Sequence, residues 1–314
     1  MRLIFFGTPE FASRCLEKIL SSKHNVAAVV TAPDKPKGRG RKVEPPAVKR
    51  LASSRNLDIL QPENLKAPEF IRNLAAYNAK LFCVVAFRIL PEEVFTLPPA
   101  GCVNLHASLL PKYRGAAPIN WAIIRGEKET GLTTFFIRRN VDSGDILLQD
   151  KLKIGSDETF GELHDRMADL GGDMLVRTID LVESGDFRPL CQDNSQVSRA
   201  PKITPELGNI DWSKPASEIH NLVRGLAPKP GAYTFRGGRK LTLLRTRIVE
   251  AKSVGALPGE VTNADPQNGM EVACGNESLA IVVLKPESGK AMTGAEYVRG
   301  YRLKNGERFE RKIE

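Results

Sequence analysis

The sequence predicts an α/β protein with an open, mostly parallel sheet at its N-terminal end and a small β-barrel at its C-terminal end. In the first 140 residues, short apolar runs alternate with stretches of helical periodicity. After residue 230, short alternating runs lie between Gly and Pro residues. We therefore expect a first domain over residues 1–188, a linker over 189–207 and a second domain over 208–314.

Each expected element of the first domain follows from its local pattern. Residues 81–86 form a continuous apolar run, as strands covered on both faces do. Pro9 suits the first turn of a helix, and the apolar residues after it recur at helical spacing. The expected strands are 2–7, 25–31, 57–60, 81–86, 103–105, 133–137 and 146–151. The expected helices cover 9–20, 45–52, 69–76, 116–124 and 160–182, and residues 32–46 are expected to form a loop.

This βαβ alternation is typical of a Rossmann-like sheet with helices on both faces. Ligand sites in such sheets gather beyond the carboxyl ends of the strands. The linker is predicted from lost periodicity and from three prolines. Beyond it, a helix over 216–224 and short strands near 241–249, 259–261 and 279–284 suggest an OB-like barrel.

The net charge of +9 is unevenly distributed along the 314 residues. Residues 34–50 hold seven basic and two acidic side chains, a net charge of +5. Residues 204–314 hold 17 basic and 13 acidic side chains, a net charge of +4. One loop and the C-terminal third therefore carry the whole excess, which indicates a polyanionic partner or a solvated basic surface.

Composition argues against several classes of protein. The five cysteines are scattered without a CxxC pair, so we expect reduced thiols, mostly buried, and no disulfide framework or zinc site. No stretch approaches the roughly 18 apolar residues of a membrane span, and the N-terminus runs directly into a strand. We expect a cytoplasmic protein without membrane insertion. Gly7 lacks a GxGxxG continuation, and no P-loop motif is present.

The strongest chemical pattern joins a strand end to a later turn. Asn104 and His106 lie two residues apart on an expected strand, so both side chains emerge on one face. An amide donor beside an imidazole suits a tetrahedral oxyanion. Asp142, in a turn-type sequence about 35 residues later, could orient the histidine or stabilise its charge.

These residues resemble the folate-dependent formyltransferases in identity, order and spacing. The resemblance covers Asn104, His106, the run Ser108–Leu109–Leu110–Pro111 and the Asp142 turn. It implies that Asn104, His106 and Asp142 are catalytic and that the Ser108–Pro111 run belongs to a site for 10-formyltetrahydrofolate, with no metal. Arg88, Ile89 and Leu90 also resemble a pterin-contacting loop of the family, although Phe87–Arg88 replaces the Tyr–Gly of many members.

Within the family, the chain is most similar to the branch whose members formylate initiator methionyl-tRNA. The similarity includes the opening Phe6–Gly7–Thr8–Pro9, the loop around Gly38–Arg39–Gly40, and Ala200–Pro201–Lys202–Ile203. It implies that Arg39, with Arg41 and Lys42, contacts tRNA. Alternatives remain: a formyltransferase for glycinamide ribonucleotide or an amino sugar nucleotide, a folate hydrolase, or a nucleic-acid-binding module without activity. We expect a monomer.

Overall fold

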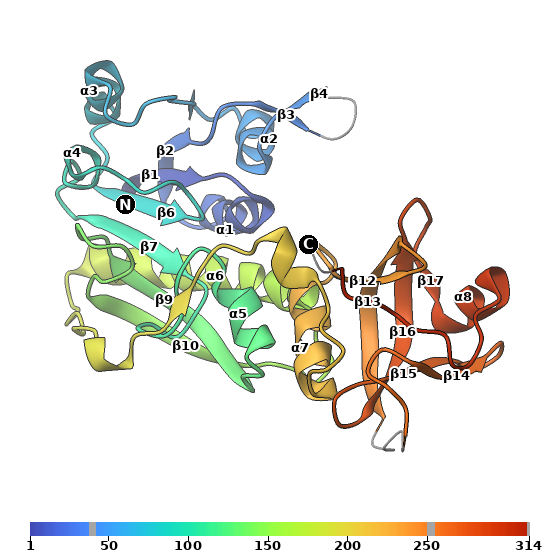
Figure 1. Ribbon diagram of the computed structural model, residues 1–314. Coiled ribbons are helices and arrows are strands. Elements are labelled where there is room, and N and C mark those ends of the chain that lie inside the picture. Colours follow the sequence, from blue (N-terminus) through green and yellow to red (C-terminus); the bar gives the residue numbers. More distant parts are fainter. Residues whose placement is uncertain (38–41, 250–254, 313–314) are drawn as a thin grey trace. The chain divides into compact units, whose positions relative to one another are not determined.

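The computed structural model describes residues 1–37, 42–249 and 255–312, and it divides into two compact units (Figure 1). The first unit comprises Met1–Gly115, Thr130–Leu152 and His164–Ala200. The second comprises Ala116–Glu129, Lys153–Leu163 and Pro201–Glu314. A seven-stranded, mostly parallel sheet lies in the first unit and an antiparallel sheet in the second, which confirms the predicted fold class.

The first unit is built around a sheet with strand order β10-β9-β7-β6-β1-β2-β5. Its strands are β1 (Arg2–Gly7), β2 (Asn25–Val30), β5 (Ile59–Leu60), β6 (Leu81–Val85), β7 (Cys102–His106), β9 (Glu129–Phe136) and β10 (Ile146–Lys153). Strands β1, β2, β5, β6 and β7 run parallel, and β9 is antiparallel to β7. The carboxyl ends of the five parallel strands therefore share one edge, which we call the carboxyl edge; the opposite edge is the amino edge.

Helices cover both faces of this sheet. They are α1 (Glu10–Leu20), α2 (Ala47–Ser54), α3 (Pro68–Ala76), α4 (Glu92–Phe95) and α6 (Phe160–Ser184). On one face, Ile4 and Phe6 pack in a cluster with Phe70 of α3 and Val94 of α4. On the other face, α6 approaches α1 closely enough for the Cys15 thiol to donate to the Ala168 carbonyl. Successive side chains of β1 point to opposite faces of the sheet, so this strand contributes to two separate apolar layers.

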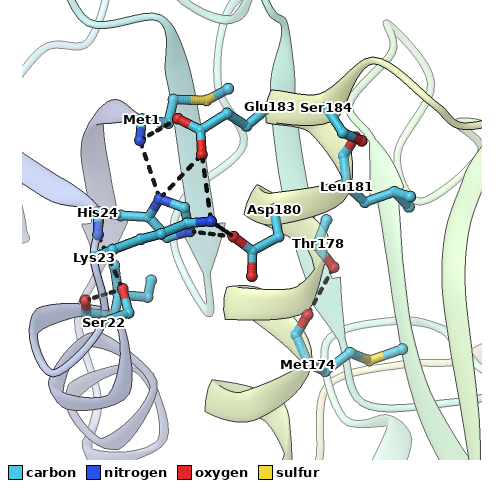
Figure 2. A network of polar contacts seen from close by, with 11 residues as sticks. Met1, Ser22, Lys23, His24, Met174, Thr178, Asp180, Leu181, Glu183 and Ser184 are labelled. Carbon is cyan, nitrogen blue, oxygen red and sulfur yellow. Dashed lines mark hydrogen bonds and ion pairs between the residues drawn. The ribbon is translucent and has the colours of Figure 1, made fainter.

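A polar network closes the amino edge of the sheet (Figure 2). His24, just before β2, is buried, and its Nδ1 lies 3.1 Å from the amino group of Met1. That amino group pairs with Glu183 at 2.6 Å, and Lys23 pairs with Asp180 at 2.7 Å. Asp180 also lies 3.4 Å from His24 Nε2. The carboxylates of α6 thus anchor the start of β1 and β2 through two ammonium groups.

The second unit centres on a six-stranded sheet of order β12-β13-β16-β15-β14, with β17 paired to β16. Its strands are β12 (Ala232–Arg236), β13 (Arg239–Val249), β14 (Val261–Asp265), β15 (Gly269–Ala273), β16 (Ser278–Pro286) and β17 (Met292–Thr293). Its helices are α5 (Pro118–Ile124), α7 (Ala216–Leu226) and α8 (Gly294–Tyr301), with the 3-10 helix η2 (Pro205–Gly208).

A short C-terminal segment bridges the regions of β12 and β14, the two outermost strands of the second sheet. Glu310 forms an antiparallel bridge with Phe235 of β12, and Arg308 forms one with Glu260 beside β14. Between them, the Phe309 amide donates to the Gly259 carbonyl at 2.7 Å. The edge strands are therefore paired rather than left open, as closure of a small sheet requires.

Two expectations about loops were too simple. Residues 32–46 were expected to form a loop, but β3 (Lys35–Lys37) and β4 (Lys42–Glu44) pair as an antiparallel hairpin. The predicted linker contains η1 (Asn194–Gln196) and β11 (Arg199–Ala200), which pairs in parallel with β8 (Arg114–Gly115). Both misses have one cause: pairs of two or three residues leave no periodicity in the sequence.

Other expectations can be compared directly. Cys15, Cys83, Cys102 and Cys274 are buried, as was predicted for most of the cysteines, and Cys191 is exposed; all five are free thiols. Burial raises the pKa of the Cys274 thiol to about 12, so it is a poor nucleophile. Within residues 1–37, 42–249 and 255–312, no helix combines the length and apolar character that a membrane span needs.

Candidate active site

Strand β7 brings Asn104 and His106 to the carboxyl edge of the first sheet. They are two residues apart on a paired strand and therefore point to the same side. His106 is buried at 6% exposure, whereas Asn104 is half-buried. Leu105, between them, pairs with Val85, so the segment that follows β6 lies beside this strand end. The carboxyl ends of β6 and β7 thus lie side by side, where the sequence predicts the site.

The chain turns back on itself after His106 and holds the imidazole from one side. The Ser108 hydroxyl donates to the Lys112 carbonyl at 2.6 Å and closes the turn. Tyr113, with a left-handed φ of 60°, then directs its carbonyl oxygen to His106 Nε2 at 2.9 Å. A carbonyl oxygen can only accept, so Nε2 carries the proton of this bond. Nδ1 is left as the nitrogen that faces the site.

The Asp142 carboxylate approaches that second nitrogen. Its Oδ2 lies 3.9 Å from His106 Nδ1 and accepts a hydrogen bond from the Gly115 amide at 2.9 Å. Asp142 itself has a left-handed φ of 53°, a conformation that aspartate tolerates better than most residues. The structure therefore brings His106 and Asp142 together from distant segments, and both nitrogens of the imidazole face acceptors.

Gly144 makes the Asp142 turn possible. A Cβ at this position would overlap the carbonyl oxygen of Phe136, the last residue of β9. The Phe136 amide in turn donates to the Asp145 carbonyl at 3.1 Å. The turn is thus pressed against the end of β9, and any side chain at residue 144 would displace it.

Two residues that contact this site were not predicted from the sequence. Gln192 donates its side-chain amide to the carbonyls of Asp142 and Gly144, at 3.0 and 2.7 Å. Ser198 accepts the Tyr113 amide at 2.9 Å through its hydroxyl. Both lie in the segment that we expected to be a linker. The only signal for them was their proximity to the Ala200–Ile203 match, which says nothing about side-chain contacts.

The run predicted to bind folate packs against β9 and β10. Leu110 is buried with Phe135 and Ile146, and its carbonyl accepts from Gln149 at 3.0 Å. Thr133 donates to the Ser108 carbonyl at 2.6 Å and accepts the Leu110 amide at 3.2 Å. The Ser108 side chain is fully buried, while Leu109 and Pro111 are partly exposed. The backbone of this run is therefore fixed in place before any ligand arrives.

The second predicted folate segment follows β6. Arg88 donates to the carbonyls of Glu63 and Pro62, at 3.0 and 2.7 Å, and its guanidinium lies 5.3 Å from the centre of the Phe87 ring. Leu90 is buried, but Ile89 is 74% exposed. Arg88 thus ties two loops of the carboxyl edge together, and Ile89 offers an exposed apolar side chain in the segment that follows β6.

The predicted tRNA contacts fall in and beside the β3–β4 hairpin. Arg39 and Arg41 lie outside the described residues, and Lys42 begins β4. At the base of this region Lys49 pairs with Asp34 at 2.7 Å. The Lys49 hydrogen bond, followed by one from Gln61, holds the pKa of the Asp34 carboxyl below its usual value. This ion pair therefore fixes the point where the basic hairpin leaves the sheet.

One group of potential metal ligands occurs among the described residues, and it lies at the amino edge. His24, Asp180 and Glu183 offer atoms within 4.8 Å of one another. The ammonium groups of Met1 and Lys23 pair with these carboxylates, as Figure 2 shows. The group belongs to the anchoring network of the amino edge, on the side of the sheet opposite to His106.

The first unit is an α/β protein with a buried histidine and a carboxylate at the carboxyl edge of a mostly parallel sheet, and comparison with known families gives the class to which it belongs. The family described as "Formyl transferase" matches residues 1–179, which hold the whole Asn104–His106–Asp142 set. The family described as "Formyl transferase, C-terminal domain" matches residues 202–302. The class of the protein is therefore that of the formyl transferases.

Two named relatives identify a narrower family within the formyl transferases. The methionyl-tRNA formyltransferase of Acetivibrio thermocellus is 44% identical over 98% of this chain and 99% of its own length. That of Trichlorobacter lovleyi is 46% identical over 97% of this chain and 96% of its own length. The chain belongs to the methionyl-tRNA formyltransferase family.

Solved structures agree on the fold. A sugar 3N-formyl transferase, WlaRD, superimposes with a TM-score of 0.67 at 18% identity, over 92% of this chain and 99% of that one. HypX from Aquifex aeolicus, in complex with tetrahydrofolic acid, gives a TM-score of 0.66 at 18% identity, over 96% of this chain and 48% of that one. At such low identity these matches show a shared fold only.

Proposed function

We propose that this protein transfers the formyl group of 10-formyltetrahydrofolate to the α-amine of methionyl-initiator tRNA. The product would be N-formylmethionyl-tRNA for translation initiation. The observation that carries this proposal is the convergence of Asn104, His106 and Asp142 at the carboxyl edge, in a chain 44% identical over nearly its whole length to a named methionyl-tRNA formyltransferase.

The proposed chemistry is an acyl transfer between two nitrogens. The α-amine attacks the formyl carbon on N10 of the folate, and free α-amines titrate near a pKa of ~7.7–8.0, so a neutral fraction exists at cellular pH. Negative charge then grows on the formyl oxygen. Asn104 and the Nδ1 proton of His106 would donate to that oxygen, and Asp142 would hold the imidazole and its charge. The bond to N10 breaks as the amine proton reaches N10, directly or through water.

The folate is proposed to lie along the carboxyl edge between the two predicted segments. A flat pterin requires apolar surface and fixed polar backbone groups. The exposed Ile89 side chain, in the segment that follows β6, supplies the first. The immobilised backbone of Ser108–Pro111 supplies the second. Folate is a co-substrate in this proposal, and no metal takes part.

The tRNA is proposed to bind the basic hairpin and the C-terminal region. Residues 34–50 and 204–314 carry net charges of +5 and +4, which suits phosphate contacts. In this proposal residues 1–188 form the catalytic domain, 189–207 a linker and 208–314 a tRNA-binding barrel. We also propose that the protein acts as a monomer in the cytoplasm.

The proposal is tested by offering the enzyme several amine acceptors with 10-formyltetrahydrofolate. We expect formyl-methionine after ester hydrolysis of charged initiator tRNA, and no comparable product from glycinamide ribonucleotide or an amino sugar nucleotide. The amino sugar nucleotide is the relevant competing acceptor, because a sugar formyltransferase shares this fold. Faster transfer to either small amine would show that the proposed acceptor is wrong. Release of formate with water as the only acceptor would show that the enzyme is a hydrolase and not a transferase.

The tRNA contacts are tested separately through Arg39. Loss of one phosphate contact weakens tRNA binding and reduces its salt dependence by about one counterion. Arg39→Ala should therefore raise the KM for methionyl-tRNA while the KM for folate stays unchanged. The exposed Arg72 of α3, which lies outside both basic regions, gives a matched control substitution. Equal increases in both KM values for Arg39→Ala would rule out a specific tRNA contact.

A further inference from the structure

Gln192 connects two loops that carry the candidate catalytic residues. Its side-chain nitrogen donates to the carbonyl oxygens of Asp142, at 3.0 Å, and Gly144, at 2.7 Å. Its side-chain oxygen accepts from Arg114, at 3.1 Å from Nε and 2.6 Å from Nη2. Gln192 is buried at 5% exposure, and the amide is therefore used on both ends. Such a two-sided polar contact fixes its neighbours in one arrangement.

The arginine on the other side of Gln192 sits inside the loop that holds His106. Tyr113, before Arg114, gives its carbonyl to His106, and Gly115, after it, gives its amide to Asp142 Oδ2. Three consecutive residues therefore contact the imidazole, Gln192 and the carboxylate in turn. The Asp142 carboxylate is held from one side by Gly115 and its backbone from the other by Gln192.

We propose that Gln192 is a positioning residue that sets the distance between Asp142 and His106 by tying the Asp142–Gly144 turn to Arg114. This inference rests on the proposed formyl transfer for its catalytic consequence. The two family matches end at residue 179 and begin again at residue 202, so Gln192 lies between them. Gln192 does not touch the reacting atoms in this proposal; it acts through the turn.

The side-chain amide is the group that this role requires. Its nitrogen must donate twice to carbonyl oxygens while its oxygen accepts from a guanidinium, and no other side chain but asparagine offers both. In Gln192→Ala the two carbonyls and the guanidinium lose a buried partner. In Gln192→Glu the contact with Arg114 survives, but an oxygen would face the carbonyls of Asp142 and Gly144.

The first experiment measures steady-state formyl transfer by Gln192→Ala. Misplacement of a catalytic group by about 1 Å can cost roughly 10²-fold in rate, so we expect kcat to fall by roughly 10- to 100-fold. Both KM values should stay within about twofold, because no substrate contact is removed. Asn194→Ala is the matched control: Asn194 also accepts from Arg114, at 3.1 Å, but in the described part of the chain it forms no hydrogen bond with the Asp142–Gly144 turn. We expect Asn194→Ala to keep the wild-type kcat.

A double-mutant cycle separates positioning from general damage. If Gln192 acts through Asp142, the double variant Gln192→Ala/Asp142→Ala should differ in rate from Asp142→Ala alone by less than about twofold. Losses that multiply in the double variant would overturn the proposal, as would a wild-type kcat for Gln192→Ala. Should Gln192→Ala fail to fold, Gln192→Glu is measured in the same cycle, and a wild-type kcat there would equally overturn it.

A structural readout distinguishes failure of this inference from failure of the proposed function. The chain has four histidines, and the NMR signal of the His106 ring can be assigned by its loss in His106→Ala. We expect Gln192→Ala to move that signal and Asn194→Ala to leave it in place. If the wild type transfers no formyl group but the signal still moves, the function fails and the positioning role stands. An unmoved signal in Gln192→Ala contradicts the positioning role whatever the activity.

Discussion

The first unit places a buried histidine beside carboxylates at each edge of one sheet, and the two arrangements differ in what surrounds the imidazole. At the amino edge, His24 Nδ1 faces the amino group of Met1 and Nε2 faces Asp180. At the carboxyl edge, His106 Nε2 bonds the Tyr113 carbonyl and Nδ1 faces Asp142. One imidazole is placed between a cation and an anion, the other between two acceptors.

The contrast has a chemical consequence. An ammonium group can only donate, so His24 Nδ1 must be unprotonated and the ring is neutral. Burial, and then the positive charge of the Met1 amino group, hold the pKa of His24 below its usual value. The Met1 and Lys23 ammonium groups also neutralise Asp180 and Glu183. A histidine near carboxylates is therefore no active site by itself. His106 differs in lying at the carboxyl edge and in contacting no ammonium or guanidinium group of the described residues.

The largest expected effect lies at the carboxyl edge. Asn104→Ala removes a proposed donor to the formyl oxygen, and loss of one such donor typically costs roughly 10²–10³ in rate. We expect kcat to fall by that amount while the melting temperature stays unchanged, since Asn104 is only half-buried. Asn25, at the amino end of β2, gives a matched control, and Asn25→Ala should keep full activity. A rate loss shared by both variants would remove the distinction between the two edges.

A smaller effect, on stability alone, is expected at the amino edge. His24→Ala removes one of the two partners of the Met1 amino group and leaves a cavity where the buried imidazole was, which together cost about 1–3 kcal/mol. The melting temperature should fall by several degrees, as calorimetry can measure, while kcat stays at the wild-type value. A His24→Ala enzyme of normal stability but reduced kcat would mean that the amino edge takes part in the chemistry.

The smallest effect concerns acidification. A histidine whose pKa is lower in the folded state binds more protons when unfolded, so its contribution is full above the unfolded pKa of about 6.5 and is lost as pH falls through the folded value. Unfolding measured from pH 7 to 5 should therefore show a steeper loss of stability for the wild type than for His24→Ala. His220, whose pKa burial also lowers, remains in both proteins and cancels. Identical slopes would contradict a neutral, buried His24.

Much of this fold could be predicted because its signals are local. The apolar run that forms β6 and the alternation that forms β13 need no knowledge of distant residues. The proximity of Asn104 and His106 at the end of β7 could be predicted for the same reason, because residues two apart on a strand share a face. The approach of Asp142 to His106 was predicted from resemblance to a family, because the 35 residues of chain between them give no geometric constraint.

What the sequence could not reveal depends on contacts between distant segments. Gln192 has ordinary polar neighbours in the sequence, and its importance comes only from two carbonyls and a guanidinium far away along the chain. The closure of the second sheet by Arg308 and Glu310 likewise rests on two isolated bridges without a strand pattern. The network at His24 joins residues more than 150 positions apart. Periodicity carries no information about such contacts.

The most direct test of the central claim is the single-turnover rate of formyl transfer in His106→Ala, Asp142→Ala and the double variant. We expect each single replacement to lower the rate by roughly 10²-fold or more, and the double replacement to be no more than a fewfold slower than the worse single one, because the two residues act as a unit. Losses that multiply, or a near-normal rate for His106→Ala, would contradict the assignment of this pair to the chemical step.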